Sequence, residues 1–391
     1  MKISEKILKI FPLLLVNYEV SNYLANDAYL PALPQLAQDL GVSSHMAQLT
    51  LTLFFLGNAT TQLFLGPLAD CYGRRPILLG GGLCFLLGTI LCATTSHIYW
   101  LLFARFIQGA AVTSMIITGY GTVHALYDTT QAIKTLAWMN SITVLAPSLG
   151  PLFGAILLLV MGWQGLFWVI ALWAALGLAS LAWLMPETCI EPVPLHPGKI
   201  AKSYWAILSN WGFMQPTLAL FFLFSAMIAW ITAGPFLIME KFNYSSVVYG
   251  ILQAVVFGCF IIGSHSTKRL INHFSPDTIA KIGATIAVIG GIVSISLAFL
   301  AKDLLIDLIV PMMLVALGSG IGFPVFNRLA IERSNETMGV KIAIFASATG
   351  LSALAGSAIV SIFYDGTVLG FSWIIFISSL ITFLFYVFHK K

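Results

Sequence analysis

Three charged side chains, Glu19, Asp27 and Arg105, lie within stretches of the sequence that are otherwise apolar. An Asp or Arg at the centre of a membrane-spanning helix costs about 2.5–3.5 kcal/mol on insertion scales. Such residues therefore persist where they face a polar cavity or find a partner. A binding or proton-carrying site is the favoured interpretation, and a purely structural ion pair is the alternative.

The spacing of these residues suggests how they are arranged. Glu19 and Asp27 are eight residues apart, which on an α-helix is about 12 Å along the axis and about 80° around it. Both can therefore border one cavity at different depths. Arg105 and Asp27 are about equally far from the outer ends of their predicted helices, so we expect a direct or water-mediated contact between them. Glu19 has no evident cationic partner in the sequence.

The chemistry of such a set is proton exchange. A carboxyl buried without a cation favours its neutral form and can take up and release protons near neutral pH, whereas a carboxylate beside an arginine stays ionised until the contact loosens. We therefore expect Asp27 and Glu19 to share proton and substrate duties, with Arg105 modulating Asp27. The Asn and Tyr side chains around them are suited to line a polar cavity, although hydrogen bonds between helices would explain their presence equally well.

The composition requires a membrane to hold these residues. Of 391 residues, 59% are hydrophobic and 9% charged, against about 25% charged in a soluble domain. The apolar residues form blocks of roughly 20, the length that crosses the hydrocarbon core of a bilayer. The fold class expected is an all-α membrane protein with twelve transmembrane helices. The predicted spans are 10–31, 45–67, 76–95, 99–121, 131–159, 163–185, 211–239, 245–267, 277–300, 304–325, 341–364 and 369–388.

The longest polar interruption, 186–204, divides the predicted spans into six and six. We therefore predict an N-terminal six-helix bundle over 1–185, a cytoplasmic linker over 186–204 and a C-terminal six-helix bundle over 205–391, with a central cavity between the bundles. Weak similarities between the two halves of the sequence are typical of a transporter whose two bundles rock about a central site. One chain of this kind contains a complete pathway, so a monomer suffices.

The basic residues predict the orientation of the chain. With the N-terminus in the cytoplasm, sixteen of the nineteen Lys and Arg residues fall at inner ends and loops, two fall outside, and Arg105 lies within a span. This bias follows the positive-inside rule and places both termini in the cytoplasm. It also accounts for the net charge of +4 without a nucleic-acid partner. The inner residues are Lys2, Lys6, Lys9, Arg74, Arg75, Lys134, Lys199, Lys202, Lys268, Arg269, Lys281, Arg328, Arg333, Lys341, Lys390 and Lys391.

Other chemistries find little support in the sequence. The five Cys show no CxxC spacing, so no metal site or disulfide framework is indicated, and no cofactor is expected. HExxH and GxSxG motifs are absent, and the seven His are scattered, so we do not expect an enzyme. No GxxxxGK[ST] loop occurs, which favours transport driven by an ion gradient over direct use of ATP through that motif.

A short motif follows the second predicted span. Gly66-Pro67-Leu68-Ala69-Asp70-Cys71-Tyr72-Gly73-Arg74-Arg75-Pro76 reads as a tight turn between two helices. Asp70 can pair with Arg74 or meet a helix N-terminus on the other bundle, which would hold one side shut until the bundles separate. The string resembles the signature loop of the major facilitator superfamily, Gly-x-x-x-Asp-x-x-Gly-Arg-Arg/Lys. The resemblance implies a gating role for Gly66, Asp70, Gly73, Arg74 and Arg75.

Two further motifs agree with this resemblance. The stretch 101–109, LLFARFIQG, resembles the superfamily's fourth-helix motif around a membrane-embedded Arg, here Arg105. The stretch 146–154, APSLGPLFG, resembles the fifth-helix motif associated with antiporters. That motif implies roles for Pro147, Gly150, Pro151 and Gly154, and Pro151 predicts a bend or hinge. Ala146 and Ala155 stand where the full antiporter pattern usually has another Gly.

The first span narrows the resemblance. Residues 18–37, YEVSNYLANDAYLPALPQLA, are similar to the first helix of MdfA-type multidrug/proton antiporters. In those proteins a Glu and an Asp eight residues apart recognise protons and drugs, and Glu19 and Asp27 match that spacing. The same resemblance implies that Tyr23, Asn26 and Tyr120 line the drug cavity.

We therefore expect a proton-coupled antiporter in a bacterial inner membrane that exports small lipophilic, often cationic, compounds. The alternative is a dedicated transporter of one metabolite, such as a siderophore, sugar or nucleoside, which could be an importer, because one scaffold serves many substrates. The residues leave open the physiological substrate, the direction of transport, and whether protons or sodium ions are coupled.

Overall fold

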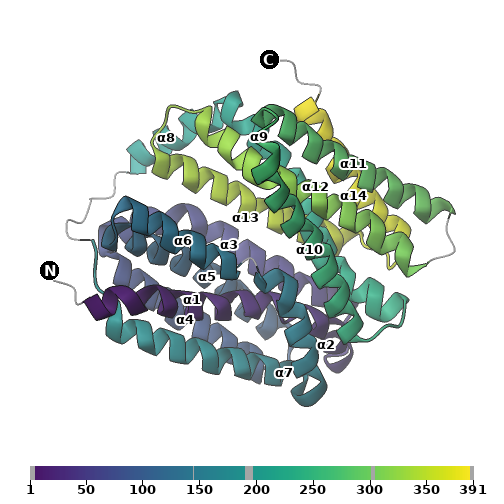
Figure 1. Cartoon of the computed structure of the whole chain (residues 1–391). Helices are drawn as coiled ribbons and strands as arrows, with labels where there is room; N and C mark the ends of the chain where they lie inside the picture. The colour runs from purple at the N-terminus through teal and green to yellow at the C-terminus, as the bar shows by residue number, and fades with distance from the viewer. Residues whose placement is uncertain (1–4, 144, 190–196, 301–303, 388–391) are drawn as a thin grey trace. The chain divides into compact units, whose positions relative to one another are not determined.

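The computed structural model describes residues 5–143, 145–189, 197–300 and 304–387, and these residues form helices with no strand among them (Figure 1). Apolar helices suit a membrane because each satisfies its own backbone hydrogen bonds. Two shorter helical segments interrupt the series, the 3₁₀ helix η1 (Leu30–Ala32) and the π-helix η2 (Leu237–Lys241). The α-helices are α1 (Glu5–Asp27), α2 (Leu33–Asp39), α3 (Ser44–Tyr72), α4 (Arg74–Thr94), α5 (Ile98–Leu126), α6 (Thr129–Thr143), α7 (Leu145–Leu184), α8 (Pro197–Leu208), α9 (Trp211–Phe236), α10 (Ser246–Leu270), α11 (Pro276–Leu300), α12 (Leu305–Glu332), α13 (Met338–Phe363) and α14 (Val368–Val387).

Ten helices within the described ranges are long and apolar enough to cross a bilayer. One of them, Thr130–Leu184, covers both α6 and α7 and is 55 residues long, whereas about 20 residues suffice for one crossing. Inside it, Gly162 has a φ of 67°, a conformation that glycine adopts readily, so α7 consists of two arms. Helix α1 is not among the ten. The fold is that of an all-helical membrane protein, and the number of twelve crossings stays a prediction.

Most predicted spans coincide with observed helices to within a few residues, but the first one ends too late. Helix α1 ends at Asp27 instead of residue 31. Pro31 and Pro34 each lie in the first turn of a new helix, where the missing N–H costs no hydrogen bond. The predicted span 131–159 falls on α6 and the first arm of α7. Residue 144 of this span and residue 388, the last of the predicted span 369–388, lie outside the described residues.

The chain divides into two compact units. Unit 1 comprises Met1–Val42 and Leu53–Leu195, and unit 2 comprises Ser43–Thr52 and His196–Lys391. The beginning of α3 therefore belongs to unit 2 and the rest of α3 to unit 1. The predicted division into 1–185, 186–204 and 205–391 stays a prediction.

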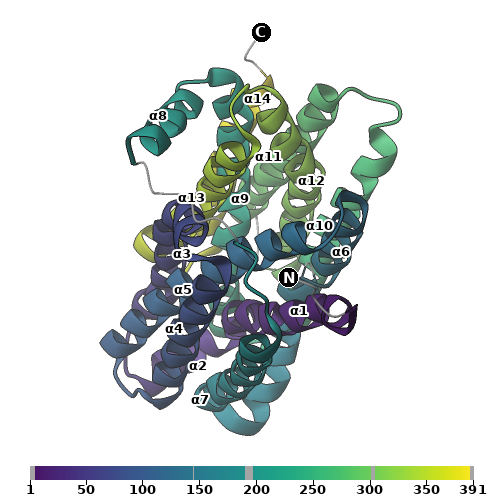
Figure 2. The same ribbon diagram turned by 90° about the vertical axis from the view of Figure 1, so that its left-hand side faces the viewer.

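In unit 1, α4 lies beside α5, and α1 lies beside α7 (Figure 2). Helices α3 and α5 cross so closely that a Cβ on Gly57 would overlap the carbonyl oxygen of Phe106, and a Cβ on Gly109 would overlap that of Phe54. Small residues allow such close approach of helices in a membrane. This crossing fixes Phe54 against the part of α5 that carries Arg105.

Unit 2 is held together by apolar packing and by buried polar pairs between helices. The main neighbours are α11 with α12, α10 with α12, and α9 with α13. Ser225 on α9 donates to the carbonyl of Ser352 on α13 (2.9 Å), and the indole of Trp230 donates to Gln253 Oε1 on α10 (2.7 Å). Because lipid offers no hydrogen bonds, such pairs satisfy polar groups that would otherwise be costly.

Candidate functional site

Glu19 lies in the middle of α1 and is almost fully buried, with 1% of its surface exposed. The hydroxyl of Tyr120 on α5 donates to Glu19 Oε1 at 2.9 Å. Glu19 Oε2 is buried and has no hydrogen-bond partner in the part of the chain that the structure describes. No cation among the described residues forms an ion pair with this carboxyl. A buried carboxylate oxygen without a donor is unfavourable, so this oxygen is ready to receive a proton or a ligand donor.

Asp27 is the last residue of α1 and is also buried. Its Oδ1 accepts a hydrogen bond from the amide Nδ2 of Asn26 at 3.1 Å. Its Oδ2 is buried and finds no partner within the described residues. The two acids therefore share one feature, since each has one hydrogen-bonded oxygen and one oxygen without a donor.

Arg105 is fully buried on α5, where it binds the end of α1. Its Nη1 donates to the carbonyl of Ala25 and to Gln108 Oε1, both at 2.9 Å. The carbonyls of a helix's last turn have no partner within the helix, and a basic side chain there is favourable. The guanidinium also lies over two rings, 4.8 Å from the Tyr29 centroid and 4.4 Å from that of Phe54. Arg105 therefore caps α1.

Of the direct or water-mediated contact expected between Arg105 and Asp27, the direct form is not found, and the water-mediated form stays a prediction. Instead, Arg105 Nη2 donates to Asn26 Oδ1 at 3.4 Å, and the amide of the same Asn26 donates to Asp27. The guanidinium meets the free carbonyl of Ala25 because α1 ends earlier than predicted. Arg105 is therefore linked to Asp27 through the side-chain amide of Asn26, which hydrogen-bonds both residues.

Gln108, which the sequence indicated only as one of the polar residues of this span, holds Arg105 in position. It is fully buried, accepts from Arg105, and donates through Nε2 to Thr89 Oγ1 on α4 at 2.8 Å. Its position three residues after Arg105, about one helical turn away, places the two side chains next to each other.

The three residues predicted to bind substrate all lie near these acids. Tyr120 and Asn26 hydrogen-bond Glu19 and Asp27 directly. Tyr23 is four residues from each acid on α1 and is half-buried, so it shares a helix face with both. The structure therefore brings the five proposed substrate-binding side chains together within unit 1.

The two glycines of the predicted antiporter motif lie against the end of α1. A Cβ on Gly150 would lie 2.9 Å from Asp27 Cβ, and one on Gly154 would overlap the carbonyl oxygen of Ala28. Pro147 and Pro151 lie within α7, which stays helical there, so the hinge expected at Pro151 is not an interruption of the helix. The motif allows α7 to approach the acid-bearing end of α1.

In the signature loop, Gly73 and the carboxylate of Glu187 together cap α4. Gly73 is the N-cap, with a φ of 97° that favours glycine. Glu187 accepts backbone N–H bonds from Arg74 and Arg75, both at 3.1 Å, and from Thr188 and Cys189, both at 2.8 Å. A carboxylate at a helix N-terminus satisfies orphan N–H groups and the helix dipole.

The arginines of this loop do not pair with Asp70. Arg74 Nη1 donates to the carbonyl of Gly121 (2.9 Å) and to Thr188 Oγ1 (3.2 Å), and Arg75 Nη2 donates to the carbonyl of Ala182 (2.7 Å). The Asp70 carboxylate is exposed. Of the two contacts considered for it, the pair with Arg74 is not found, and the contact with a helix N-terminus on the other bundle stays a prediction. Ala182 lies in the last turn of α7, where carbonyls have no partner within the helix. Gly66 lies within α3 with open space around it.

Glu187 was missed as a functional candidate because it appeared only as one charge of the polar linker. Partial burial alone would raise the pKa of its carboxyl, but the four backbone N–H groups hold that pKa below its usual range.

We expect the Glu187→Gln variant to unfold more readily than the wild type at neutral pH. Because the folded-state pKa is depressed, the carboxylate's contribution is fully present above the unfolded value of about 4.3 and is lost as the pH falls through the folded value. Thermal unfolding in detergent at pH 7 and at progressively lower pH checks this. A difference between the two proteins that grows on acidification would contradict the proposed cap.

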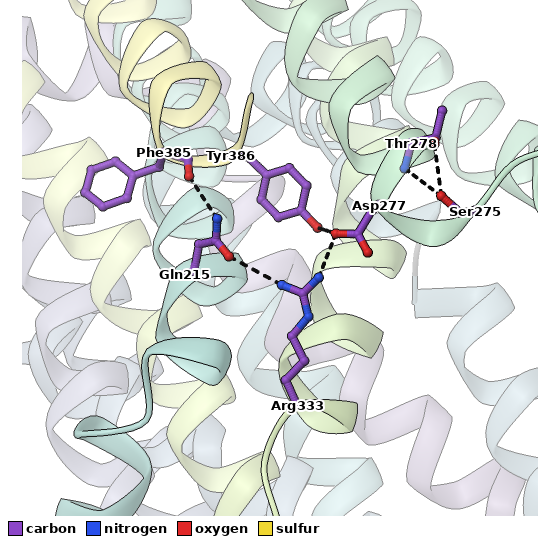
Figure 3. A network of polar contacts seen from close by, with 7 residues as sticks. All are labelled: Gln215, Ser275, Asp277, Thr278, Arg333, Phe385 and Tyr386. Carbon is purple, nitrogen blue, oxygen red and sulfur yellow. Dashed lines mark hydrogen bonds and ion pairs between the residues drawn. The ribbon is translucent and has the colours of Figure 1, made fainter. Parts of the chain in front are cut away.

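Unit 2 has a polar network at the ends of four helices (Figure 3). Arg333 Nη2 donates to Asp277 Oδ1 (2.6 Å), as does the hydroxyl of Tyr386 (2.8 Å). Arg333 Nη1 donates to Gln215 Oε1 (3.4 Å), whose amide donates to the carbonyl of Phe385 (3.1 Å). Partial burial would lower the pKa of Arg333, yet Asp277 holds it above its usual value. The network ties together α9, α11, α12 and α14.

No group of three or more His, Cys, Asp or Glu side chains among the described residues is placed to hold a metal ion. The polar centre of unit 1 therefore consists of two acids, an arginine and their amide and hydroxyl partners.

Comparison with known proteins gives a consistent family. The family model described as Major Facilitator Superfamily matches residues 19–357. The chain is 32% identical over 329 residues to the chloramphenicol resistance protein CraA of Acinetobacter baumannii, covering 84% of this chain and 80% of that protein. It is 30% identical over 331 residues to the multidrug transporter MdfA of Yersinia pestis, covering 84% and 81%.

Solved structures agree at the level of the fold. A POT family transporter in complex with 5-aminolevulinic acid matches with a TM-score of 0.78 at 12% identity, covering 97% of this chain and 95% of that one. A bacterial homologue of the human lysosomal transporter Spinster matches with a TM-score of 0.73 at 14% identity, covering 98% and 96%. The chain belongs to the major facilitator superfamily and is a multi-pass membrane transporter, not an enzyme.

Proposed function

We propose that this transporter is a proton-coupled antiporter that exports small lipophilic, often cationic, compounds across the bacterial inner membrane by alternating access. Two curated relatives that cover most of the chain are named for chloramphenicol resistance and multidrug transport. The distribution of Lys and Arg supports placing both termini in the cytoplasm. A monomer suffices for this function.

The observation that carries the proposal is the state of the two acids on α1. Glu19 and Asp27 are both buried, and each keeps one oxygen without a hydrogen-bond donor. A proton on that oxygen removes the cost of burying it, and a donor or a positive charge on a substrate removes the same cost. Proton and substrate therefore compete for the same atoms, which is the requirement for exchange.

The hydrogen-bond partners give each acid a distinct role. Asp27 is linked to Arg105 through the amide of Asn26, so rotation of that amide changes how strongly the arginine favours ionised Asp27. Glu19 is linked to Tyr120, and no cation among the described residues forms an ion pair with it. We assign Asp27, with Arg105 as its modulator, mainly to the proton, and Glu19 with Tyr23, Asn26 and Tyr120 mainly to the substrate.

Rigid motion of one unit against the other does not by itself change the Asp27–Asn26–Arg105 chain, because all three residues lie in unit 1. In this scheme the bound substrate is the coupling agent, since it takes up the hydrogen bonds of Asn26 and Tyr120. The signature loop, with Gly66, Asp70, Gly73, Arg74 and Arg75, then acts as the gate, and Gly150 and Gly154 hold the site's wall.

Substrate-induced proton release tests the proposal. Adding tetraphenylphosphonium, a lipophilic cation, to the detergent-solubilised protein in weak buffer should acidify the solution. We expect the release to fall strongly in Glu19→Gln and in Asp27→Asn. Release that is unchanged in both variants would refute the competition between proton and substrate.

A further inference from the structure

Two open grooves on the surface of unit 1 lie between α1 and the helices α6 and α7, and together they are called the seam. At one end, a groove of about 350 Å³ is lined by Pro12 and Leu13 of α1 and by Lys134, Thr135 and Trp138 of α6. Further along, a groove of about 230 Å³ lies between Val20 and Leu24 of α1 and a row of side chains opposite. That row is Ile142, Leu145, Ala146, Leu149, Gly150, Phe153 and Trp173.

The residues that line the two grooves form one stripe along α1 and one along α6 and α7. On α1, Leu13, Val20 and Leu24 follow the i, i+7, i+11 spacing of a single helix face. On α6 and α7, the lining residues recur every three or four positions from Lys134 to Phe153. Apart from Lys134 and Thr135 at one end, the lining residues are mostly apolar, and Leu13 and Leu149 remain 55% and 50% exposed. Asn17, exposed on the same face of α1, accepts a hydrogen bond from the indole of Trp173 at 3.0 Å.

Among the described side chains, the polar end of the seam carries one cation, Lys134. The ammonium of Lys134 is exposed and has no hydrogen bond or ion pair with any described residue. Thr135 and Trp138 lie beside it, and indole rings favour the headgroup level of a bilayer. An exposed lysine next to an interfacial tryptophan matches an anionic headgroup in charge and position.

The length of the seam matches one leaflet. From Leu13 to Leu24 is eleven residues, or about 16 Å at 1.5 Å per residue. Half of a hydrocarbon core of about 30 Å is about 15 Å. A lipid whose headgroup lies at Lys134 would therefore extend its acyl chain to Leu24, close to the bilayer centre.

We propose that the seam is a binding site for one anionic phospholipid, with its phosphate at Lys134 and Thr135 and an acyl chain along Val20, Leu24 and Leu149. The acyl chain then lies against Gly150, which is so close to Asp27 that a Cβ on it would lie 2.9 Å from Asp27 Cβ, so the lipid supports the wall of the polar site from outside. The binding can be measured without transport and does not depend on the proposed antiport.

Native mass spectrometry of the delipidated full-length protein in detergent tests the headgroup. Wild-type protein should bind phosphatidylglycerol more tightly than phosphatidylcholine. Lys134→Gln should reduce the affinity for phosphatidylglycerol about fivefold, the effect of one lysine near an anionic headgroup. Lys281→Gln, an exposed lysine on α11 of unit 2, is the matched control and should leave both affinities unchanged. Equal binding of the two lipids by the wild type, or an equal loss in both variants, would overturn the proposal.

A second measurement locates the acyl chain. Phosphatidylglycerol with a diazirine on its acyl chain should crosslink to residues 12–24 and 134–153 in the wild type, and Leu149→Trp, which fills the groove, should suppress those crosslinks. Crosslinks spread evenly over other helices would contradict the site. Displacement by tetraphenylphosphonium at the concentrations that saturate transport would show a substrate path in the seam and would also overturn the lipid assignment.

Discussion

Replacing Asp27 by Asn is expected to abolish export against a proton gradient and to leave a folded, membrane-inserted protein. The amide of Asn has the size of the carboxyl and can still accept the bond from Asn26 through its oxygen. It cannot take up or release a proton at physiological pH. Uptake of a lipophilic cation into inside-out vesicles, driven by an imposed pH gradient, should therefore fall to background.

A matched control separates this effect from a general loss of acidic charge. Glu332 is half exposed and pairs with Arg328 four residues earlier, an arrangement worth little to stability. Glu332→Gln should transport at the wild-type rate. If Asp27→Asn still accumulates substrate uphill, Asp27 is not the coupling acid and the role passes to Glu19 or to another ion.

The sequence alone predicted the helices of this protein well, because hydrophobic runs of bilayer length have few alternative structures in lipid. The prediction failed where the sequence stays apolar beyond the end of the helix. Residues 28–31 are apolar, so hydropathy extended the first span, whereas Pro31 and Pro34 begin new helices there. The break predicted between the spans 131–159 and 163–185 agrees with the structure, because Gly162, the non-helical residue inside α7, lies in that interval.

The residues of the polar site could be predicted from the sequence, but the hydrogen bonds between them could not. The cost of burying charge identified Glu19, Asp27 and Arg105 from the sequence. Which atoms they contact depends on where α1 ends and on the rotamers of neighbouring side chains, so the bond from Arg105 to Ala25 and the bridging role of Asn26 could not be inferred. Glu187 was missed for the same reason, because its partners are backbone N–H groups about 110 residues earlier.

The Gly154→Ala variant tests the packing that supports this site, and we expect it to lose both stability and transport. The new Cβ would overlap the carbonyl oxygen of Ala28 and lie 2.6 Å from its carbonyl carbon. Backbone atoms cannot move aside by changing rotamer, so α1 and α7 must separate. Overpacking of this kind costs about 1–3 kcal/mol. The melting temperature in detergent should fall, and Gly80→Ala, which adds a Cβ in open space on α4, should not lower it.

The transport loss in Gly154→Ala follows from the position of Ala28, one residue after Asp27. A shift of the end of α1 changes the distance from the Ala25 carbonyl to Arg105 and from the Asn26 amide to the same guanidinium. The coupling chain is therefore disturbed even though no titratable group is changed. If Gly154→Ala melts and transports like Gly80→Ala, the close approach of α7 to α1 does not position Asp27, and the glycines of this motif act elsewhere.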